Sequence, residues 1–276
     1  MHSTNTIILY RKHDTDEEEV KTIHEFFEAT SNRTAVSDNQ LVIGRYSVLP
    51  YYRELELDLA IYNSRLVNSY AQHEFVADIG QWSEVLAGFT PQTWVQGQFD
   101  LLPEDKSFVL KGQTNSKKFL WNTHMFAKDK DSVRDVMSLL LDDSLIGRQT
   151  IYAREYVPLI TYGHALNGLP ITKEFRFFVL YGEVVCGGYY WSNYADDVNL
   201  KAGPLKADDV PEYFLKKVVE KIGDLVSFYA IDIAQTQTGD WTVIDVNDGQ
   251  MSGLSEIQPR ALYMGMTRIL RKRGLL

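Results

Sequence analysis

The strongest constraint on the fold is a stretch of alternating apolar residues that runs from residue 228 to residue 247 and is interrupted by Thr238-Gly239. Alternation with a period of two predicts β-strands, and a glycine-containing dipeptide between two such runs predicts a tight hairpin turn. A two-residue turn at this point pairs Gln237 with Asp240. The stretch therefore predicts an antiparallel hairpin whose register can be counted outwards from its turn.

This register brings acidic and amide side chains together on one face. Counting back from the turn sets Asp232 directly opposite Asp245, and Asn247 follows on the same face. The alternate positions face the core and are apolar: Ile231, Ile233, Ile244 and Val246. Like charges opposite each other in an antiparallel pair are destabilising unless a cation compensates them, and Mg²⁺ prefers such oxygen ligands. The hairpin thus predicts a magnesium site, with a solvated pair of aspartates as the simpler alternative.

A second hairpin is predicted between Lys173 and Tyr190, with its turn at Tyr181-Gly182. Its first strand has two faces, one with Phe175, Phe177 and Val179 and the other with Glu174, Arg176, Phe178 and Leu180. The predicted register sets Arg176 opposite Gly187, whose missing side chain leaves room for a ligand beside the guanidinium. Arginine is suited to bidentate binding of a phosphate, although most strand arginines lie at the surface or in salt bridges.

A third candidate site is a lysine at the end of a short apolar strand, Phe108 to Lys111, followed by the polar loop 112–118. In such an arrangement the lysine reaches a phosphate, and small loop residues let backbone N–H groups approach an anion. By itself the pattern is weak, because a lysine at a strand end is usually solvated.

The remaining segments predict mixed α/β structure without internal repeats. Strands are expected at residues 6–10, 40–49, 55–62 and 150–158, and helices at 16–29, 71–87 and 129–141. Pro91 ends the second of these helices and indicates a boundary between lobes.

Composition disfavours several classes of function. A formal net charge of −9 argues against a nucleic-acid partner, because affinity for a phosphate backbone comes from clustered lysine and arginine. No apolar run is long enough to span a bilayer, and the first twelve residues do not resemble a secretory signal. The single cysteine, Cys186, excludes an internal disulfide. We therefore expect a cytoplasmic protein with no membrane partner.

Taken in order, the segments resemble the ATP-grasp superfamily. The matching motifs are the lysine strand 108–111, the hinge-like strand 152–157, the arginine strand 174–179, and Asp232 with the motif Asp245-Val246-Asn247. The resemblance covers about the last two thirds of the chain and rests on motif order. The sequence is most similar to a short, divergent branch of phage and bacterial proteins of unassigned role. A eukaryotic relative of this branch assists the assembly of a translation initiation factor.

The resemblance implies an α/β (α+β) fold of three lobes that clasp ATP. These are an N-terminal α/β lobe at residues 1–90, a small ATP-grasp lobe at 91–158 and a large ATP-grasp lobe at 159–276, which carries the metal site. It implies ATP and Mg²⁺ as cofactors, with nucleotide contacts from Lys111, Lys117, Lys118, Arg154, Glu155, Tyr156, Val157 and Arg176.

Further roles are implied residue by residue. Lys111 and Arg176 would be catalytic, and Asp232, Asp245 and Asn247 would bind the metal. The residues beyond the metal strand, Asp248 and Ser252, would contact the substrate, although Asp248-Gly249 is equally consistent with an ordinary turn.

The sequence also departs from the superfamily pattern. Gly112 is the single glycine of the phosphate loop, which leaves closure to Lys117 or Lys118. Asp245 stands where a glutamate is common, and a second ATP-contacting lysine has no counterpart near Trp94.

Two functions follow from the resemblance. The first is an ATP-dependent carboxylate-amine ligase that forms an acyl phosphate and acts on an amino acid, a peptide or a protein. The alternative is an ATP-binding assembly, chaperone or regulatory factor that keeps the fold but does not ligate.

Overall fold

The computed structural model describes residues 5–45, 51–194 and 205–276. Its N-terminal lobe is a parallel sheet with strand order β2-β1-β3-β4 and two helices. The strands are β1 (Asn5–Tyr10), β2 (Glu28–Thr30), β3 (Gln40–Arg45) and β4 (Arg65–Leu66), and the helices are α1 (Glu17–Phe26) and α2 (Tyr52–Ile61). The strand predicted at 40–49 is confirmed for its first six residues, and residues 46–49 lie outside the described part of the chain.

Helix α2 corrects the strand that we predicted at residues 55–62. Leu55, Leu57 and Leu59 alternate with acidic residues and therefore imitate the period of a strand. Only Leu55 and Leu59 are buried, together with Tyr52, whereas Leu57 is 60% exposed. Spacings of three and four residues place the buried side chains on one helical stripe, and packing of this stripe against the sheet decides the outcome.

The small lobe is an antiparallel sheet with strand order β5-β8-β6-β7. Its elements are β5 (Thr93–Val95), β6 (Phe108–Gly112), β7 (Phe126–Ala127), α5 (Lys130–Leu141) and β8 (Ile151–Glu155). The helix predicted at 71–87 is in fact two helices, α3 (Tyr70–Ala77) and α4 (Ile79–Val85). Asp78 separates them because it has an extended backbone and its side chain accepts a hydrogen bond from the N–H of Gly80.

The large lobe is built on the antiparallel sheet β12-β11-β13-β14. Its elements are β9 (Thr161–His164), β10 (Pro170–Thr172), β11 (Glu174–Leu180), β12 (Glu183–Tyr189), α6 (Glu212–Ile222), β13 (Phe228–Gln235), β14 (Trp241–Asp248) and α7 (Pro259–Lys272). Short helical turns connect these elements and those of the other lobes: Arg33–Ala35, Gln96–Leu101, Lys118–Leu120, Trp121–Met125, Ile146–Arg148, Leu166–Gly168, Ser192–Tyr194, Ala207–Asp209 and Gly223–Leu225.

In the β13–β14 hairpin, Asp232 pairs with Asp245 as predicted, but by a different route. The turn contains three residues rather than two, because the N–H of Thr236 donates to the carbonyl of Asp240. The predicted pairing of Gln237 with Asp240 is therefore wrong. A β-bulge at Ile244 restores the register, since Ile233 pairs with Val243 while Asp232 pairs with Asp245.

The β11–β12 hairpin has the predicted faces and turn but a different register beyond a bulge. Leu180 pairs with Glu183, which confirms the turn at Tyr181-Gly182. An extra residue in β12 then sets Arg176 opposite Gly188 rather than Gly187. A Cβ atom on Gly188 would lie 2.8 Å from the side chain of Ile257, so packing alone explains this glycine.

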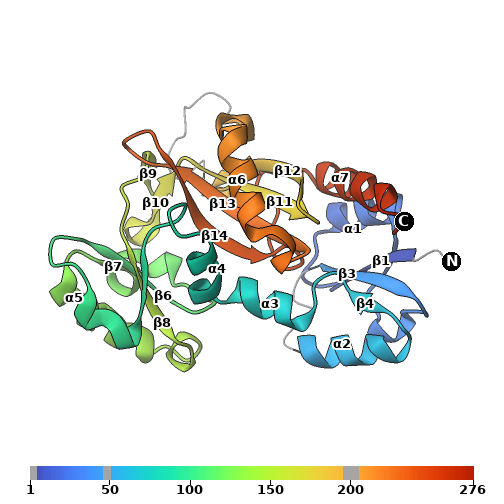
Figure 1. Ribbon diagram of the computed structural model, residues 1–276, viewed down its shortest axis with the longest axis horizontal. Coiled ribbons are helices and arrows are strands. Elements are labelled where there is room, and N and C mark those ends of the chain that lie inside the picture. Colours follow the sequence, from blue (N-terminus) through green and yellow to red (C-terminus); the bar gives the residue numbers. More distant parts are fainter. Residues whose placement is uncertain (1–4, 46–50, 195–204) are drawn as a thin grey trace.

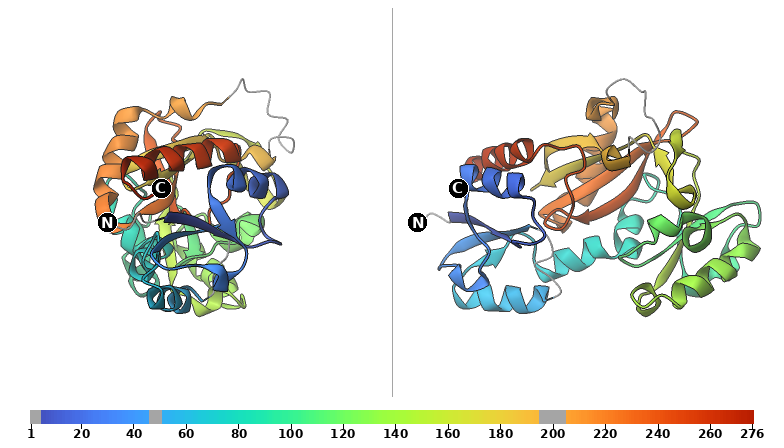
Figure 2. Two further views of the ribbon diagram at one scale, coloured as in Figure 1. Left: turned by 90° about the vertical axis from the view of Figure 1, so that its right-hand side faces the viewer. Right: turned by 180° about the vertical axis from the view of Figure 1, so that it is seen from behind.

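The three sheets lie at the corners of an elongated molecule, with α3 and α4 running between the N-terminal lobe and the other two (Figure 1). Two further views show α7 lying beside α1, far from the small lobe (Figure 2). One apolar core joins Ile8 and Ile23 of the N-terminal lobe to Phe178, Phe228 and Leu262 of the large lobe. The chain therefore returns at its C-terminal end to close the lobe with which it began.

Candidate functional site

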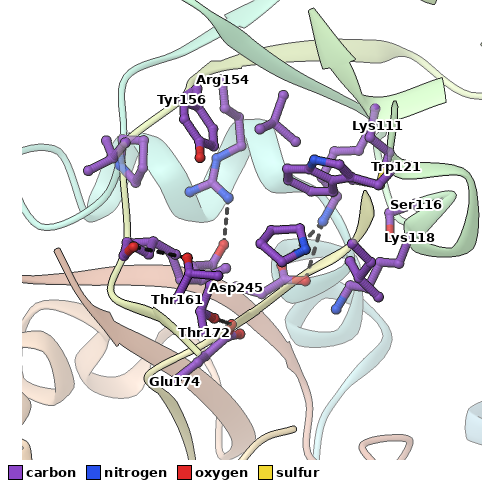
Figure 3. A pocket seen from close by; sticks show the side chains of 18 of the residues that line it. Lys111, Ser116, Lys118, Trp121, Arg154, Tyr156, Thr161, Thr172, Glu174 and Asp245 are labelled. Atoms are coloured by element: carbon purple, nitrogen blue, oxygen red, sulfur yellow. Dashed lines mark hydrogen bonds and ion pairs between the residues drawn. The ribbon is translucent and has the colours of Figure 1, made fainter. Parts of the chain in front are cut away.

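A pocket lies between the small-lobe sheet and the large-lobe sheet (Figure 3). Three segments supply its walls: β6 and the loop after it, β8 and its exit, and the facing strands β11 and β14. They contribute Val109, Lys111, Ser116 and Lys118, then Arg154, Glu155, Tyr156 and Val157, and then Glu174, Ile244 and Asp245. Trp121, Met125 and Leu169 add apolar surface. The pocket thus combines an apolar slot with several charged groups.

Lys111 and Asp245 face each other across this pocket. The Nζ atom of Lys111 lies 3.3 Å from Oδ1 and 3.4 Å from Oδ2 of Asp245, which joins β6 of the small lobe to β14 of the large lobe. Burial lowers the pKa of Lys111, and the nearby carboxylate opposes part of this effect. Burial also acts to raise the pKa of Asp245, but Lys111, Lys118 and Arg154 outweigh it and lower that pKa.

Of the two loop lysines, Lys118 lines the pocket and Lys117 does not. The Nζ atom of Lys118 donates to the hydroxyl of Tyr190 at 2.7 Å and lies 5.4 Å from the centroid of the Trp191 ring. Lys117 instead forms an ion pair with Asp143. The two lysines follow each other in sequence, yet only Lys118 is directed at the space between the lobes.

Arg154 holds the bulge that sets the position of Asp245. Its guanidinium donates to the carbonyl of Ile244, the bulged residue, and to the hydroxyl of Thr90 at 2.7 Å. Burial lowers its pKa to about 10. Its Nε atom has no hydrogen-bond partner among the described residues. At the exit of β8, Glu155 is ion-paired with Lys106 at 3.0 Å.

Arg176 and Asp232 form a buried bidentate pair. The Nε and Nη2 atoms of Arg176 donate to the two carboxylate oxygens of Asp232, each at 2.8 Å, and Nη1 donates to the carbonyl of Gly253 at 2.9 Å. Asp232 is only 1% exposed. Its carboxylate therefore neutralises Arg176 and lines neither the pocket nor the hollow beside it.

That adjoining hollow lies on the far side of Lys111 and Lys118. It brings together the other predicted residues: Lys111, Lys118, Arg176, Asp245, Asn247, Asp248 and Ser252. Residues of α3 and of the loop 251–253 complete it. The hydroxyl of Ser252 donates to the carbonyl of Asp248 at 2.9 Å, so these two residues stabilise each other. Except for Asp232 and Lys117, every predicted site residue thus lines the pocket or the hollow.

Asp245 and Asn247 fit a magnesium ion better than Asp232 does. Both border the hollow with oxygen-bearing side chains, which Mg²⁺ prefers alongside phosphate oxygens. The oxygens of Asp232 would first have to release Arg176. Within residues 5–45, 51–194 and 205–276, no group of three or more His, Cys, Asp or Glu side chains is arranged to hold a metal ion. The same part of the chain contains no helix long and apolar enough to cross a membrane.

Two site residues were missed by sequence reasoning, Glu174 and His73. Glu174 lies in the pocket, where its Oε2 atom accepts hydrogen bonds from the Trp191 indole at 2.9 Å and the Thr172 hydroxyl at 3.0 Å. Its alternation with Arg176 assigned it correctly to that face of β11, but nothing local indicated a buried ligand-facing carboxyl group. His73 borders the hollow from α3, and its partner is 175 positions away in sequence.

Comparison with solved structures agrees with this fold. The RimK domain ATP-grasp protein of Sphaerobacter thermophilus is 15% identical with a TM-score of 0.59, and the alignment covers 96% of this chain and 97% of that one. The ATP-grasp ligase PsnB, solved with a minimal precursor, is 10% identical with a TM-score of 0.60, covering 98% and 99%. The D-alanine–D-alanine ligase of Bacillus anthracis, complexed with ATP, is 11% identical with a TM-score of 0.57, covering 97% and 98%.

Sequence comparison is more specific. No curated protein matches the chain. Residues 12–265, however, match a family described as an ATP-grasp domain, the third family of its clade, which confirms the resemblance inferred from motif order. The chain therefore belongs to this family of ATP-grasp domains.

Proposed function

We propose that this protein is an ATP- and Mg²⁺-dependent carboxylate-amine ligase that acts through an acyl phosphate. Membership of the ATP-grasp family supports a ligase-type enzyme that uses ATP. Proteins of similar fold include a D-alanine–D-alanine ligase complexed with ATP and the ligase PsnB complexed with Mg and ADP. An amino acid, a peptide or a protein would supply the carboxylate and the amine. Action in the cytoplasm and a phage or bacterial origin belong to the same proposal.

The pocket between the sheets suits a nucleotide. Trp121, Met125 and Val157 offer apolar surface for a base beside the exposed backbone at the exit of β8. Lys111 and Lys118 border both the pocket and the hollow, so a polyphosphate that crosses from one to the other would pass between them. Such an arrangement neutralises phosphate charge in a site shielded from water, where electrostatic interactions are strong.

The chemistry requires positioning rather than a covalent nucleophile. A carboxylate oxygen of the substrate attacks the terminal phosphorus, and the bond to ADP breaks. The amine nitrogen then attacks the acyl carbon, and inorganic phosphate leaves. Lys111 and Arg176 would stabilise the charge that develops on the transferring group. Mg²⁺ bound by Asp245 and Asn247, and by Asp232 if Arg176 turns towards phosphate, would supply further charge neutralisation.

One observation carries the proposal. The cations Lys111, Lys118 and Arg176 converge with Asp245 and Asn247 on one hollow, although they come from both ATP-grasp lobes. Buried charges are costly unless they are paired, so a cluster of this kind at an open surface between two sheets favours a charged ligand.

The alternative is an ATP-binding assembly or regulatory factor that does not ligate. The pairing of both aspartates with protein cations favours it, because Arg176 occupies Asp232 and Lys111 contacts Asp245. A site that neutralises itself can bind and release a nucleotide without turning it over. Release of ADP in the presence of an amine and a carboxylate separates the two functions.

The first test is calorimetric titration of the protein with ATP in the presence and absence of MgCl₂. We expect magnesium-dependent binding that Asp245→Ala weakens at least about tenfold, because Lys111 loses its partner and the metal loses a ligand. Asp240→Ala is the matched control, since Asp240 is exposed at the turn of the same hairpin. Equal affinity of wild type and Asp245→Ala would contradict the assigned site. Wild-type protein that binds no ATP would overturn the proposed function.

A further inference from the structure

A histidine–aspartate pair borders the hollow where the carboxylate and the amine would meet. The Nδ1 atom of His73, on α3, lies 3.1 Å from Oδ2 of Asp248, at the end of β14. The imidazole ring also stacks on the ring of Tyr52, with centroids 4.5 Å apart and planes 10° from parallel. Hydrogen bond and stacking together fix the plane and the orientation of the imidazole.

The aspartate of this pair is itself held rigidly. Asp248 is buried, and its Oδ1 atom accepts hydrogen bonds from the N–H of Gln250 at 2.9 Å and the amide of Asn68 at 3.0 Å. The Asn68 amide also donates to the carbonyl of Phe228 at 2.7 Å. Oδ1 is thereby engaged by backbone and side-chain donors, and Oδ2 is directed at His73.

This arrangement determines which nitrogen of His73 carries the proton. An ionised carboxylate only accepts hydrogen bonds, so Nδ1 must be the donor and Nε2 of the neutral ring keeps its lone pair. Within the described residues, no protein group forms a hydrogen bond with Nε2. Because His73 lines the hollow together with Lys111 and Arg176, its free nitrogen is available to a ligand in that hollow.

We propose that His73 is the general base that accepts a proton from the attacking amine and that Asp248 positions it. This inference rests on the proposed ligase function. As the amine nitrogen bonds to the acyl carbon, the C–O bond to phosphate breaks, and the N–H proton passes to Nε2 of His73. The imidazolium formed is stabilised by the Asp248 carboxylate through Nδ1. The substrate class for this hollow is therefore a primary amine, and Val76 and Met251 provide apolar surface for its carbon chain.

The first part of the test needs no substrate. The histidine side chains of the ¹⁵N-labelled protein are observed by NMR at neutral pH, and the signal missing from His73→Gln identifies His73. We expect neutral His73 to carry its proton on Nδ1. A proton on Nε2 in the neutral ring would overturn the positioning by Asp248, whether or not the protein ligates.

The second part measures chemistry. ADP release and amide formation are followed with MgATP and the standard amino acids as carboxylate and amine, and again with hydroxylamine as the amine. Hydroxylamine is largely unprotonated at neutral pH and a strong nucleophile, so it depends far less on a base. We expect His73→Gln to reduce the rate with amino acids about 100-fold or more and the rate with hydroxylamine much less. ATP affinity should be unchanged.

A matched variant and distinct outcomes keep the two proposals separate. His164→Gln is the control, because His164 is exposed and lines neither the pocket nor the hollow. Wild-type protein that ligates no combination would overturn the proposed function, and the base with it. Active wild type with equal losses for His73→Gln towards both kinds of amine would overturn the base alone.

Discussion

At the scale of single residues, Glu174 is the most unusual group in the pocket. Burial, with a smaller contribution from Asp232, raises its pKa from 4.5 to about 7. Between these pH values the folded chain binds a proton that the unfolded chain releases. Stability must therefore fall as the pH rises from about 4.5 through about 7, the reverse of the usual behaviour of a paired carboxylate.

This leads to a prediction for Glu174→Gln, which cannot ionise. Between about pH 5 and about pH 8 the wild type should lose up to about 3 kcal/mol of unfolding free energy that the variant retains. Urea unfolding at both pH values measures the difference. Glu84→Gln serves as control, because Glu84 is exposed on α4. If Glu174→Gln and the wild type lost equal stability, the carboxyl group would have to be ionised throughout.

At the scale of elements, the site depends on the β13–β14 hairpin. Its three-residue turn shifts the register by one position, and the bulge at Ile244 shifts it back. The bulge also turns Ile244 away from the core into the pocket, while Val243 is completely buried in its place. Arg154 holds the bulged carbonyl, so the position of Asp245 depends on a contact between two lobes.

The turn of this hairpin gives a second prediction. Gly239 has a φ of +94°, and a Cβ atom there would meet nothing within 4 Å. Replacement by alanine should therefore cost about 1 kcal/mol or more through backbone strain alone. Gly97→Ala is the control, because Gly97 has equal space without a positive φ. Equal urea-unfolding midpoints for the two variants would show that the turn tolerates a side chain.

At the scale of the whole molecule, a buried arginine connects the first lobe to the site. Arg45 at the end of β3 is fully buried and donates to Glu19 at 2.8 Å, and to the carbonyls of Gly249 and Ser252 at 3.0 and 3.2 Å. These two carbonyls belong to the loop that follows β14 and borders the hollow. The N-terminal lobe thus fixes one wall of the candidate acceptor site.

We predict that Arg45→Met destabilises the protein by about 3–5 kcal/mol, because it leaves the buried carboxylate of Glu19 without its main cation. The double variant Arg45→Met/Glu19→Leu should lose clearly less, since no buried charge remains. Thermal unfolding of the wild type, the two single variants and the double variant measures this. A double variant no more stable than Arg45→Met would mean that the lost carbonyl contacts, and not the stranded charge, dominate.

The sequence by itself determined the elements that have a clear period. The faces of β11, the turn at Tyr181-Gly182 and the pairing of Asp232 with Asp245 followed from alternation, and motif order identified the family that residues 12–265 confirm. These features are local, or they combine local signals in sequence order. The lobe boundaries and the roles of individual site residues stay predictions.

Tertiary structure alone decided the features that depend on distant partners. Packing on the sheet made residues 52–61 a helix, and Asp143 rather than the pocket received Lys117. Asp232 was assigned to Arg176, which lies on the neighbouring strand β11. His73 gained its aspartate from the far end of the chain. Charges and hydrogen bonds act through space, so no pattern of neighbouring residues could have specified these pairs.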